Sequence, residues 1–310
     1  MPRKGAHSLE NLEQLKEELG REKVAYVCNE PMSLHTTFKV GGKVTLMIRP
    51  DSEYGLAAAL AACRQTATPY FILGRGSNLL VSDEGADLAV VHLGDTYSTM
   101  RMADAVTIDA QSGVSLNKLC RYALDHSLTG LEFAFGIPGS LGGAVYMNAG
   151  AYGGEMKNVV KSVRYIDEKG ELRTALQDEL DFRYRHSMFS GRSCCIVAVQ
   201  LELAKGDPTA IRSRMDELME ARIEKQPLEF GSAGSTFKRP EGAYAAQLID
   251  CCGLKGFSIG DAQVSEKHAG FIINRGHATC AEIKELIDRV REVVLQKTGY
   301  KLECEVLQLG

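Results

Sequence analysis

A stretch of nineteen residues, 136–154, carries the clearest chemical signal in this 310-residue sequence. Seven of its residues are glycine, and none is Lys, Arg, Asp or Glu. Glycine reaches backbone angles that other residues avoid, so such a segment can approach a ligand closely and turn its N–H groups towards phosphate oxygens. The stretch predicts a site for a large anionic ligand. The alternative is a glycine-rich turn that joins two elements.

A second glycine-containing segment, residues 74–81, reads G-R-G-S-N-L-L-V and follows a predicted strand. Its start suggests the dinucleotide-binding fingerprint, but Leu79 replaces the third glycine and no helix is predicted to follow. What remains is a polar loop in which Ser77 and Asn78 can hydrogen-bond to a phosphate or a ribose, with Arg75 as a charge partner. A phosphate-binding P-loop at residues 136–143 is excluded because the Lys-Ser/Thr pair is missing.

Residues 181–189 form an unusual connector that contains Arg183, Arg185 and His186 together with aromatic residues. Such groups can bind an anion or take part in proton transfer. The alternative is a solvated, salt-bridged loop, which is the more frequent setting for isolated arginines.

Two later segments contain hydroxyl and carboxyl groups. Residues 230–240 read F-G-S-A-G-S-T-F-K-R-P and predict a small-residue loop with a hydroxyl at Ser235. The loop is not a G-x-S-x-G hydrolase elbow, so Ser235 is either a proton donor or a turn hydroxyl. Glu303 and Glu305 are expected on one face of a terminal strand, an arrangement that is also common without any function.

Composition excludes several classes of protein. Lys plus Arg number 36 against 40 Asp plus Glu, and the net charge of −4 argues against a general nucleic-acid binder. The nine cysteines show no C-x-x-C spacing. Their odd number, without a secretory signal, favours reduced thiols in the cytosol. No apolar run reaches the length that a membrane span requires, and we expect no metal site.

The remaining pattern alternates predicted strands and helices. A strand at 45–49, an alanine-rich helix at 53–64 and a strand at 70–73 make a βαβ unit. Helices are also predicted at 8–19, 116–126, 211–224, 244–252 and 282–298, and strands at 106–110, 159–166, 196–203 and 271–274. The last helix should turn six residues inward: Ile283, Leu286, Ile287, Val290, Val293 and Val294.

The order of these motifs closely resembles the UDP-N-acetylenolpyruvoylglucosamine reductase family, in its shorter subtype. The resemblance spans about residues 20–309 and rests on T-T-F-K-V-G-G, L-G-R-G-S-N-L-L-V, the glycine-rich stretch, Y-R-H-S-M-F, G-S-T-F-K-R-P, V-S-E-K-H-A-G-F-I-I-N and L-E-C-E-V. It implies an α+β protein with the FAD-binding fold of the vanillyl-alcohol oxidase type and a C-terminal α+β substrate domain. The implied division is an N-terminal helix at 1–22, FAD-binding subdomains at 23–95 and 96–206, and a substrate-binding domain at 207–310.

The resemblance also implies an activity. It is the FAD-dependent reduction of UDP-N-acetylglucosamine enolpyruvate to UDP-N-acetylmuramate by NADPH, a step in peptidoglycan synthesis and so in cell-wall biogenesis, cell shape and cell division. The implied protein is a cytoplasmic monomer with non-covalent FAD and no nucleic-acid or membrane partner. Two alternatives remain, an FAD-dependent oxidase or dehydrogenase of a small alcohol or hydroxy acid and a non-catalytic flavin-binding module.

By the same resemblance, Arg185 binds the substrate carboxylate, Ser235 gives a proton to C2, and Glu305 assists the carboxylate. Less diagnostic candidates for contact with the substrate are Tyr152, Lys225 and Arg239. The implied FAD-binding residues are Gly41, Gly42, Leu73, Gly74, Arg75, Gly76, Ser77, Asn78, Gly136, Ile137, Pro138, Gly139, Gly142, Gly143 and Ala144.

Overall fold

The computed structural model describes residues 9–310, which divide into two compact units. The first unit contains the described residues up to Val27, Leu46–Arg75 and Leu88–Ala221; the second contains Cys28–Thr45, Gly76–Asp87 and Arg222–Gly310. Each unit therefore combines segments that are far apart in the sequence. The four-part division expected at residues 22, 95 and 206 stays a prediction, and residues 1–8 lie outside the described part of the chain.

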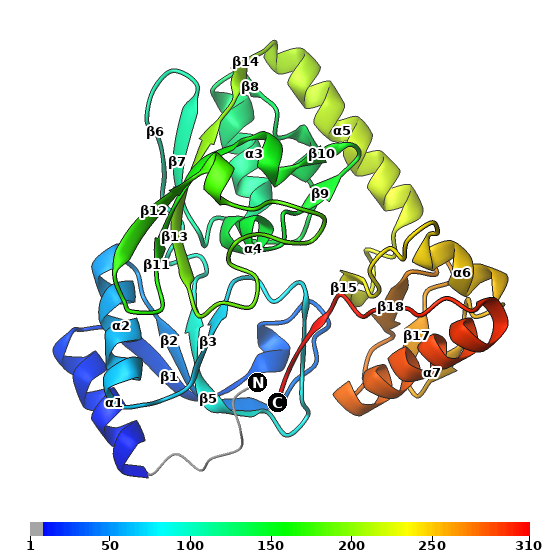
Figure 1. The fold of residues 1–310 in the computed structure, drawn as a ribbon, viewed down its shortest axis with the longest axis horizontal. Coiled ribbons are helices and arrows are strands. Elements are labelled where there is room, and N and C mark those ends of the chain that lie inside the picture. The colour runs from blue at the N-terminus through cyan, green and yellow to red at the C-terminus, as the bar shows by residue number, and fades with distance from the viewer. Residues whose placement is uncertain (1–8) are drawn as a thin grey trace. The chain divides into compact units, whose positions relative to one another are not determined.

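A four-stranded sheet in the order β1-β2-β5-β3 lies mainly in the first unit. It is accompanied by two helices (Figure 1). The elements are α1 (Leu9–Arg21), β1 (Ala25–Pro31), β2 (Lys43–Arg49), α2 (Glu53–Gln65), β3 (Tyr70–Leu73) and β5 (Ala86–His92). Leu15 and Leu19 of α1 are buried in one cluster with Leu56 and Leu60 of α2. Burial of these apolar side chains holds the helices in place.

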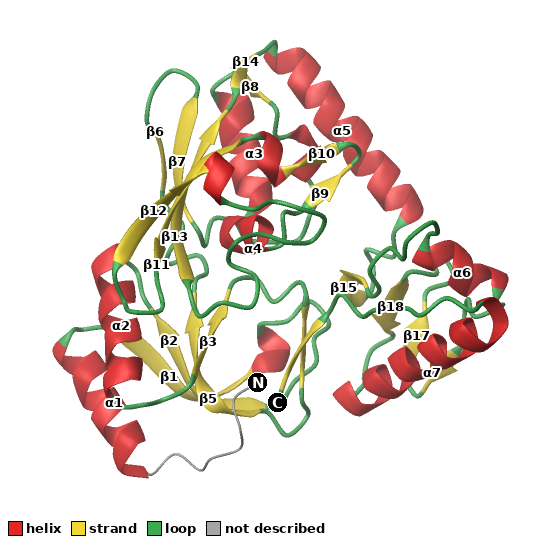
Figure 2. Cartoon of the chain, viewed as in Figure 1, coloured by secondary structure: helices red, strands yellow, loops and turns green. Residues whose placement is uncertain are grey.

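The rest of the first unit is built on a five-stranded antiparallel sheet in the order β12-β11-β13-β7-β6. Figure 2 shows helices beside these strands. The elements are β6 (Met100–Met102), β7 (Thr107–Gln111), α3 (Leu116–Asp125), β8 (Leu128–Thr129), α4 (Leu141–Tyr146), β9 (Gly150–Ala151), β10 (Gly154–Glu155), β11 (Val160–Ile166), β12 (Leu172–Leu176), β13 (Cys195–Glu202), β14 (Ala204–Lys205) and α5 (Pro208–Lys225), whose residues from Arg222 on belong to the second unit. Ile211 and Met215 of α5 belong to the apolar core of this region.

The second unit contains a sheet in the order β15-β18-β17-β16 with two helices. Its elements are β4 (Leu79–Val81), β15 (Gly231–Ser235), α6 (Ala245–Cys251), β16 (Ser258–Ile259), β17 (Ala262–Val264), β18 (Phe271–Asn274), α7 (Cys280–Thr298) and β19 (Leu307–Leu309). Short 3₁₀ helices in the chain are Met32–Leu34, Glu132–Ala134, Met156–Asn158 and Gln177–Glu179. β19 pairs in parallel with β4, which is more than two hundred residues earlier.

The predicted inward face of α7 is confirmed. Five of the six residues are buried, and Val293 is partly buried against the same core. The helix begins at a capping box between Thr279 and Glu282 and ends at Gly299, whose φ of 76° is left-handed. Local signals and the helical period were therefore enough to define this element.

Two local predictions were wrong. The terminal strand begins at Leu307, so Glu303 and Glu305 precede it, and only Cys304 forms an isolated bridge, to Phe237. Residues 230–240 are not only a loop, because Gly231–Ser235 forms β15 and pairs with β18. In both places long-range pairing decides the structure, and pairing partners cannot be read from a local pattern.

Candidate active site

The segment that follows β3 lies against the start of α4. An added Cβ at Gly74 would be 2.2 Å from Ser140 Oγ, so only glycine permits this approach without a shift. Leu73 is buried at the end of β3, and Ser140 is the N-cap residue of α4. The structure therefore brings together two segments that were predicted to bind the same cofactor, residues 73–75 and 136–144.

The glycine-rich stretch is rigidly held by its neighbours. Gly136 N–H donates to Asn117 Oδ1 at 2.7 Å, Leu141 N–H to Val114 O at 2.8 Å, and Gly142 N–H to Ser112 O at 2.8 Å. The N–H groups of Ile137, Gly139 and Ala144 also have acceptors inside the stretch or next to it. The prediction that the N–H groups of this stretch turn towards an anion is therefore wrong for these residues, because chain acceptors already use them.

Ser112 is a polar group at this site that the sequence did not indicate. Its residue is 2% exposed, and its Oγ has no hydrogen-bond partner among residues 9–310. Ser112 Cβ would lie only 2.8 Å from a Cβ at Gly142. A buried hydroxyl without a partner is costly, so a ligand group that hydrogen-bonds to it would be stabilised there.

Arg185 lies at the tip of a two-residue turn. Arg183 N–H donates to His186 O and His186 N–H to Arg183 O, each at 3.1 Å, which closes the turn around Tyr184 and Arg185. The backbone of Arg185 is left-handed, with a φ of 53°. Its guanidinium carbon is 5.2 Å from the centre of the Tyr184 ring. Non-glycine residues in this conformation are uncommon and concentrate at functional sites.

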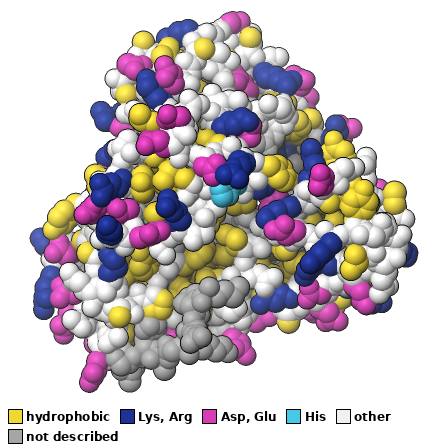
Figure 3. All heavy atoms as spheres, viewed as in Figure 1, with side chains coloured by type: hydrophobic (Ala, Val, Ile, Leu, Met, Phe, Trp, Pro, Cys, Tyr) yellow, Lys and Arg dark blue, Asp and Glu magenta, His cyan; other side chains and the backbone are white. Residues whose placement is uncertain are grey.

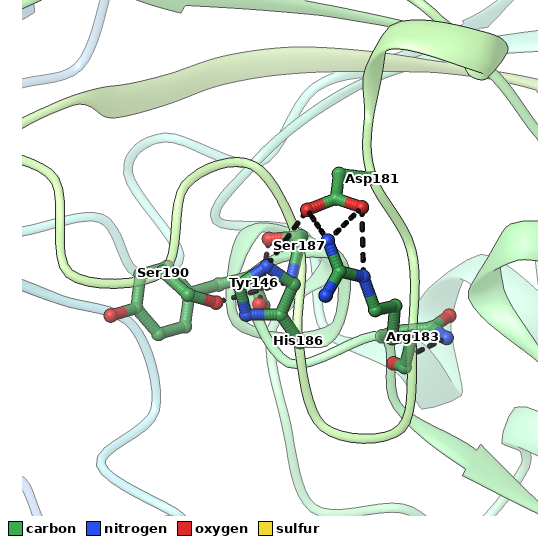
Figure 4. Close-up of polar contacts among 7 residues, drawn as sticks. Tyr146, Asp181, Arg183, His186, Ser187 and Ser190 are labelled. Atoms are coloured by element: carbon green, nitrogen blue, oxygen red, sulfur yellow. Dashed lines mark hydrogen bonds and ion pairs between the residues drawn. The ribbon is translucent and has the colours of Figure 1, made fainter.

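The neighbouring charges at the base of the turn are paired with each other (Figure 4). Arg183 Nη2 is 2.7 Å from Asp181 Oδ2, and His186 Nε2 is 3.1 Å from the same oxygen. The Arg183 guanidinium beside Asp181 lowers the pKa of that carboxyl below its ordinary value. The interpretation as a salt-bridged loop is thus confirmed for Arg183 and His186, which frame Arg185 from both sides.

In the second unit, the loop at residues 76–78 is fixed by close backbone contacts. Gly76 has a φ of +60°, and an added Cβ would be 2.0 Å from His35 O. Thr37 N–H donates to Gly76 O at 3.2 Å. Gly41 and Gly42 lie against residues 81–85, since a Cβ at Gly42 would be 2.2 Å from Asp83 O. These glycines permit close packing of the backbone.

Backbone hydrogen bonds bring the other two predicted catalytic residues to one place in the same unit. Ser235 ends β15 with an exposed side chain, and Thr236 next to it is completely buried. Thr236 O accepts the Glu305 N–H at 2.8 Å, and Glu305 O accepts Asn78 Nδ2 at 3.1 Å. Leu307 N–H donates to Asn78 O at 3.0 Å. The predicted flavin loop, the Ser235 strand and Glu305 are therefore neighbours, although 227 residues separate Asn78 from Glu305.

The strand that carries Ser235 has little freedom to move. Ser235 pairs with Phe271, Thr236 N–H donates to Gly270 O at 2.8 Å, and Thr236 Oγ1 accepts the Ile272 N–H at 3.1 Å. Gly234, with a φ of +72°, precedes Ser235 at an irregularity in the pairing. A bulge of this kind re-aims the next side chain.

The weaker substrate-binding candidates are divided between the units. Tyr152 belongs to the first unit and lies between β9 and β10 with a left-handed φ of 52°. Lys225 and Arg239 belong to the second unit. The Arg239 guanidinium carbon is 4.4 Å from the centre of the Tyr244 ring, a cation–π contact.

The described residues were also searched for a metal site and for a helix that could cross a membrane. Among residues 9–310, no group of three or more His, Cys, Asp or Glu side chains is arranged to hold a metal ion. None of the helices in this range is both long and apolar enough to cross a bilayer. On the face drawn in Figure 3, acidic and basic side chains are interspersed and no basic patch dominates.

The chain is similar to known proteins over most of its length. Residues 44–175 match a family described as an FAD binding domain, so the chain is a flavoprotein of the FAD-binding fold. Residues 226–309 match the C-terminal domain of UDP-N-acetylenolpyruvoylglucosamine reductase. The predicted α+β class, with an FAD-binding part and a C-terminal substrate domain, is confirmed.

Individual relatives agree. The enzyme of that name from Heliobacterium modesticaldum is 48% identical over 91% of this chain and 90% of its own length. The one from Caldanaerobacter subterraneus is 45% identical over 96% of this chain and 98% of its own. The crystal structure of UDP-N-acetylenolpyruvylglucosamine reductase from Thermus caldophilus superposes with a TM-score of 0.79 at 34% identity, covering 93% of this chain and 99% of that one. The chain belongs to the UDP-N-acetylenolpyruvoylglucosamine reductase family.

Proposed function

We propose that this protein is the flavoenzyme that reduces the enolpyruvyl ether of UDP-N-acetylglucosamine to UDP-N-acetylmuramate with NADPH, in peptidoglycan precursor synthesis. Family membership across nearly the whole chain supports this activity over that of an oxidase of small alcohols or of a non-catalytic flavin module. When bound, FAD would supply the hydride chemistry that links NADPH, as donor, to C3 of the enolpyruvyl group, as acceptor. The tasks left to the protein are to orient the substrate, stabilise charge at C2 and its carboxylate, and deliver a proton.

The residues around Gly74 and Gly142 fit a flavin diphosphate or its adjoining ribityl chain. Gly74 and Gly142 let these segments pack closely against Ser140 and Ser112, because a Cβ at either glycine would collide with those residues. The Ser112 hydroxyl, buried and without an acceptor or donor in the described chain, is the polar group that such a ligand would satisfy. We assign cofactor binding to these segments together with residues 76–78.

Arg185 binds the carboxylate of the enolpyruvyl group. A guanidinium offers two parallel N–H donors to a carboxylate, and its positive charge stabilises the negative charge that grows on those oxygens when C3 receives hydride. Arg185 lies at the tip of a tight turn whose base carries the Asp181–Arg183 ion pair and the contact of His186 with Asp181. Because Asp181 is neutralised locally by Arg183, it competes less with the substrate carboxylate for Arg185.

Ser235 donates the proton to C2. A serine hydroxyl is a weak acid in water, so it must be placed next to a carbon that is already strongly basic. The hydrogen bond from Thr236 N–H to Gly270 O and the pairing of Ser235 with Phe271 support this role, because they limit the movement of the Ser235 backbone. Glu305, joined through its N–H to Thr236 O, assists the substrate carboxylate.

We further propose that Tyr152, Lys225 and Arg239 contact the uridine diphosphate part of the substrate, where cationic and aromatic groups suit a nucleotide. The protein acts as a monomer in the cytoplasm and uses NADPH as its reductant. Light scattering of the purified protein and a comparison of the two nicotinamide cofactors in the reductive half-reaction test these points.

The observation that carries this proposal is the set of hydrogen bonds that joins Asn78, Thr236 and Glu305. It links a predicted flavin loop to Glu305 and, through Thr236, to the neighbouring Ser235, two residues with predicted roles at the substrate. The purified protein should be yellow, and NADPH should bleach it anaerobically. UDP-N-acetylglucosamine enolpyruvate should then restore the colour. A flavin that NADPH bleaches but this substrate never reoxidises would refute the assignment.

Ser235→Ala tests the proton donor. Reduction of the flavin by NADPH should remain nearly normal, whereas reoxidation by the enolpyruvyl substrate should slow by about 10²-fold or more, the usual contribution of a positioned acid. Stopped-flow absorbance at the flavin band measures both steps. Equal slowing of the two half-reactions would instead assign Ser235 a structural role.

A further inference from the structure

Asn148 is a buried polar residue in the glycine-rich stretch, two positions after the end of α4. It is 1% exposed, and its backbone is left-handed with a φ of 42°. Asparagine is one of the few non-glycine residues that tolerate this conformation. Its N–H donates to Val145 O at 3.2 Å, which ties it to the end of the helix.

The side-chain amide of Asn148 connects three segments of the first unit. Its Nδ2 donates to Arg183 O at 3.1 Å and to Glu155 Oε2 at 2.8 Å. Its Oδ1 accepts the Lys157 N–H at 3.0 Å. Both donor hydrogens and one lone pair are therefore used, and a buried amide in this state holds its partners in a defined geometry.

The contact with Arg183 O is at the base of the turn that carries Arg185. Arg183 closes that turn with His186, and Ser187 Oγ donates to Tyr146 O at 2.7 Å on its other side, a pair drawn in Figure 4. The turn is thus attached at one end to the last residue of α4 and at the other to Asn148, two residues beyond that helix. A left-handed Arg185 costs conformational energy and persists only where surrounding contacts determine it.

We propose that Asn148 is a positioning residue for the reductive step on the substrate, acting through Arg185. It fixes the Arg183 carbonyl, and with it the turn, to the helix whose glycines we assign to the flavin. The distance and angle between the hydride donor and the substrate carboxylate are then set by one rigid connection. This inference rests on the proposed role of Arg185.

The exposed charges beside the turn cannot supply the same constraint. Asp181 and Arg183 are solvent-accessible, and exposed ion pairs contribute little and fluctuate. The amide of Asn148 is buried, so its hydrogen bonds do not compete with water. Loss of its side chain should let the turn shift, and a displacement of about 1 Å can slow a reaction by about 10²-fold.

Asn148→Gly is the most informative variant because glycine adopts a φ of 42° without strain and removes only the side-chain bonds. The holoenzyme is reduced with NADPH and then mixed with the enolpyruvyl substrate in a stopped-flow instrument. Reoxidation should slow by about 10- to 100-fold. Reduction by NADPH should stay within about twofold, because NADPH has no carboxylate at its reacting end for Arg185 to hold.

Two further comparisons separate positioning from general destabilisation. In an Arg185→Ala background, adding Asn148→Gly should change reoxidation by less than about twofold, since residues that act as a unit are not additive. Asn158→Ala is the matched control. It removes the bond from Glu155 N–H to Asn158 Oδ1 at 3.0 Å in the neighbouring segment, and it should leave both half-reactions unchanged.

The possible results are distinguishable. Equal slowing of both half-reactions by Asn148→Gly, no slowing of reoxidation, or a full additional loss in the Arg185→Ala background would overturn the positioning role. If Arg185→Ala itself leaves reoxidation unchanged, the proposed role of Arg185 fails, and the inference fails with it. If Asn148→Gly does not fold, Asn148→Asp replaces it: aspartate keeps the acceptor for Lys157 N–H but loses the donors to Arg183 O, and it should slow reoxidation equally.

Discussion

Gly142 and Gly143 are neighbours in α4, but their surroundings predict opposite effects of the same substitution. An added Cβ at Gly142 would be 2.8 Å from Ser112 Cβ and 3.3 Å from Ser112 O. The nearest atom to a Cβ at Gly143 is Ser140 Oγ at 3.5 Å, an ordinary contact. Neither glycine has a left-handed backbone, so alanine is allowed conformationally at both positions.

The magnitudes follow from two opposing effects. Replacing glycine by alanine inside a helix stabilises it by about 0.5–1 kcal/mol, and both variants gain this. Gly142→Ala must also push against Ser112, whose backbone is held by Val197 O through its N–H and by Gly142 N–H through its carbonyl. Overpacking of this kind costs about 1–3 kcal/mol. The variants should therefore differ by about 1–3 kcal/mol, with Gly142→Ala the less stable.

Thermal unfolding of the flavin-free protein, followed by circular dichroism, measures this difference. At about 2–4 °C per kcal/mol for a unit of this size, Gly143→Ala should melt several degrees above Gly142→Ala. A titration of the flavin-free protein with FAD, followed by flavin fluorescence, then tests the cofactor assignment. If FAD lies against α4, Gly143→Ala should weaken FAD binding although it stabilises the protein. Equal melting temperatures for the two variants would refute the packing reasoning.

Three more predictions concern other parts of the chain. Asp83 accepts hydrogen bonds from the first two N–H groups of α7 at 2.8 and 3.0 Å. Asp83→Asn should therefore lower the free energy of unfolding, measured by denaturant titration, by about 1 kcal/mol. An unchanged midpoint would contradict this capping role. The hydrogen bond from Arg183 lowers the pKa of Asp181, so the stability from this contact is present above the ordinary carboxyl pKa and is lost as pH falls through the lowered value. Asp181→Asn should therefore flatten the pH dependence of unfolding in that window. An ordinary pKa for Asp181, measured by NMR, would contradict this prediction. Burial raises the pKa of the Cys120 and Cys195 thiols to about 12. A thiol reagent at neutral pH should therefore modify the two exposed cysteines of the chain first. Rapid reaction at either buried thiol would contradict this prediction and show that the core opens readily.

Local elements could be predicted well because their signals are local. The strand Tyr70–Leu73, the helix Glu53–Gln65 and the long helix α7 each have the period, cap residues and stop signals of their type within the element or beside it. The family and its cofactor could also be predicted, since several motifs occur in a fixed order and each constrains residues close in sequence.

The wrong local predictions share one cause. The terminal strand starts later than expected because Glu305 N–H bonds to Thr236 O and Leu307 N–H to Asn78 O, partners that no short window contains. Likewise, the N–H groups of the glycine-rich stretch appeared available for an anion. The tertiary structure instead gives them chain acceptors, such as Ser112 O for Gly142.

The sequence by itself determined most of the longer helices and strands, the family and the FAD cofactor, and it led to the proposal that Arg185, Ser235 and Glu305 act on the substrate. Only the tertiary structure decided how they are supported. Ser112 lies outside the recognised motifs, and Asn148 lies inside the glycine-rich stretch without any local sign of its role. Their importance lies in burial and in partners such as Gly142 and Arg183 that are about thirty or more residues away. Burial makes a polar group either costly or precisely held, and burial is a property of the folded chain.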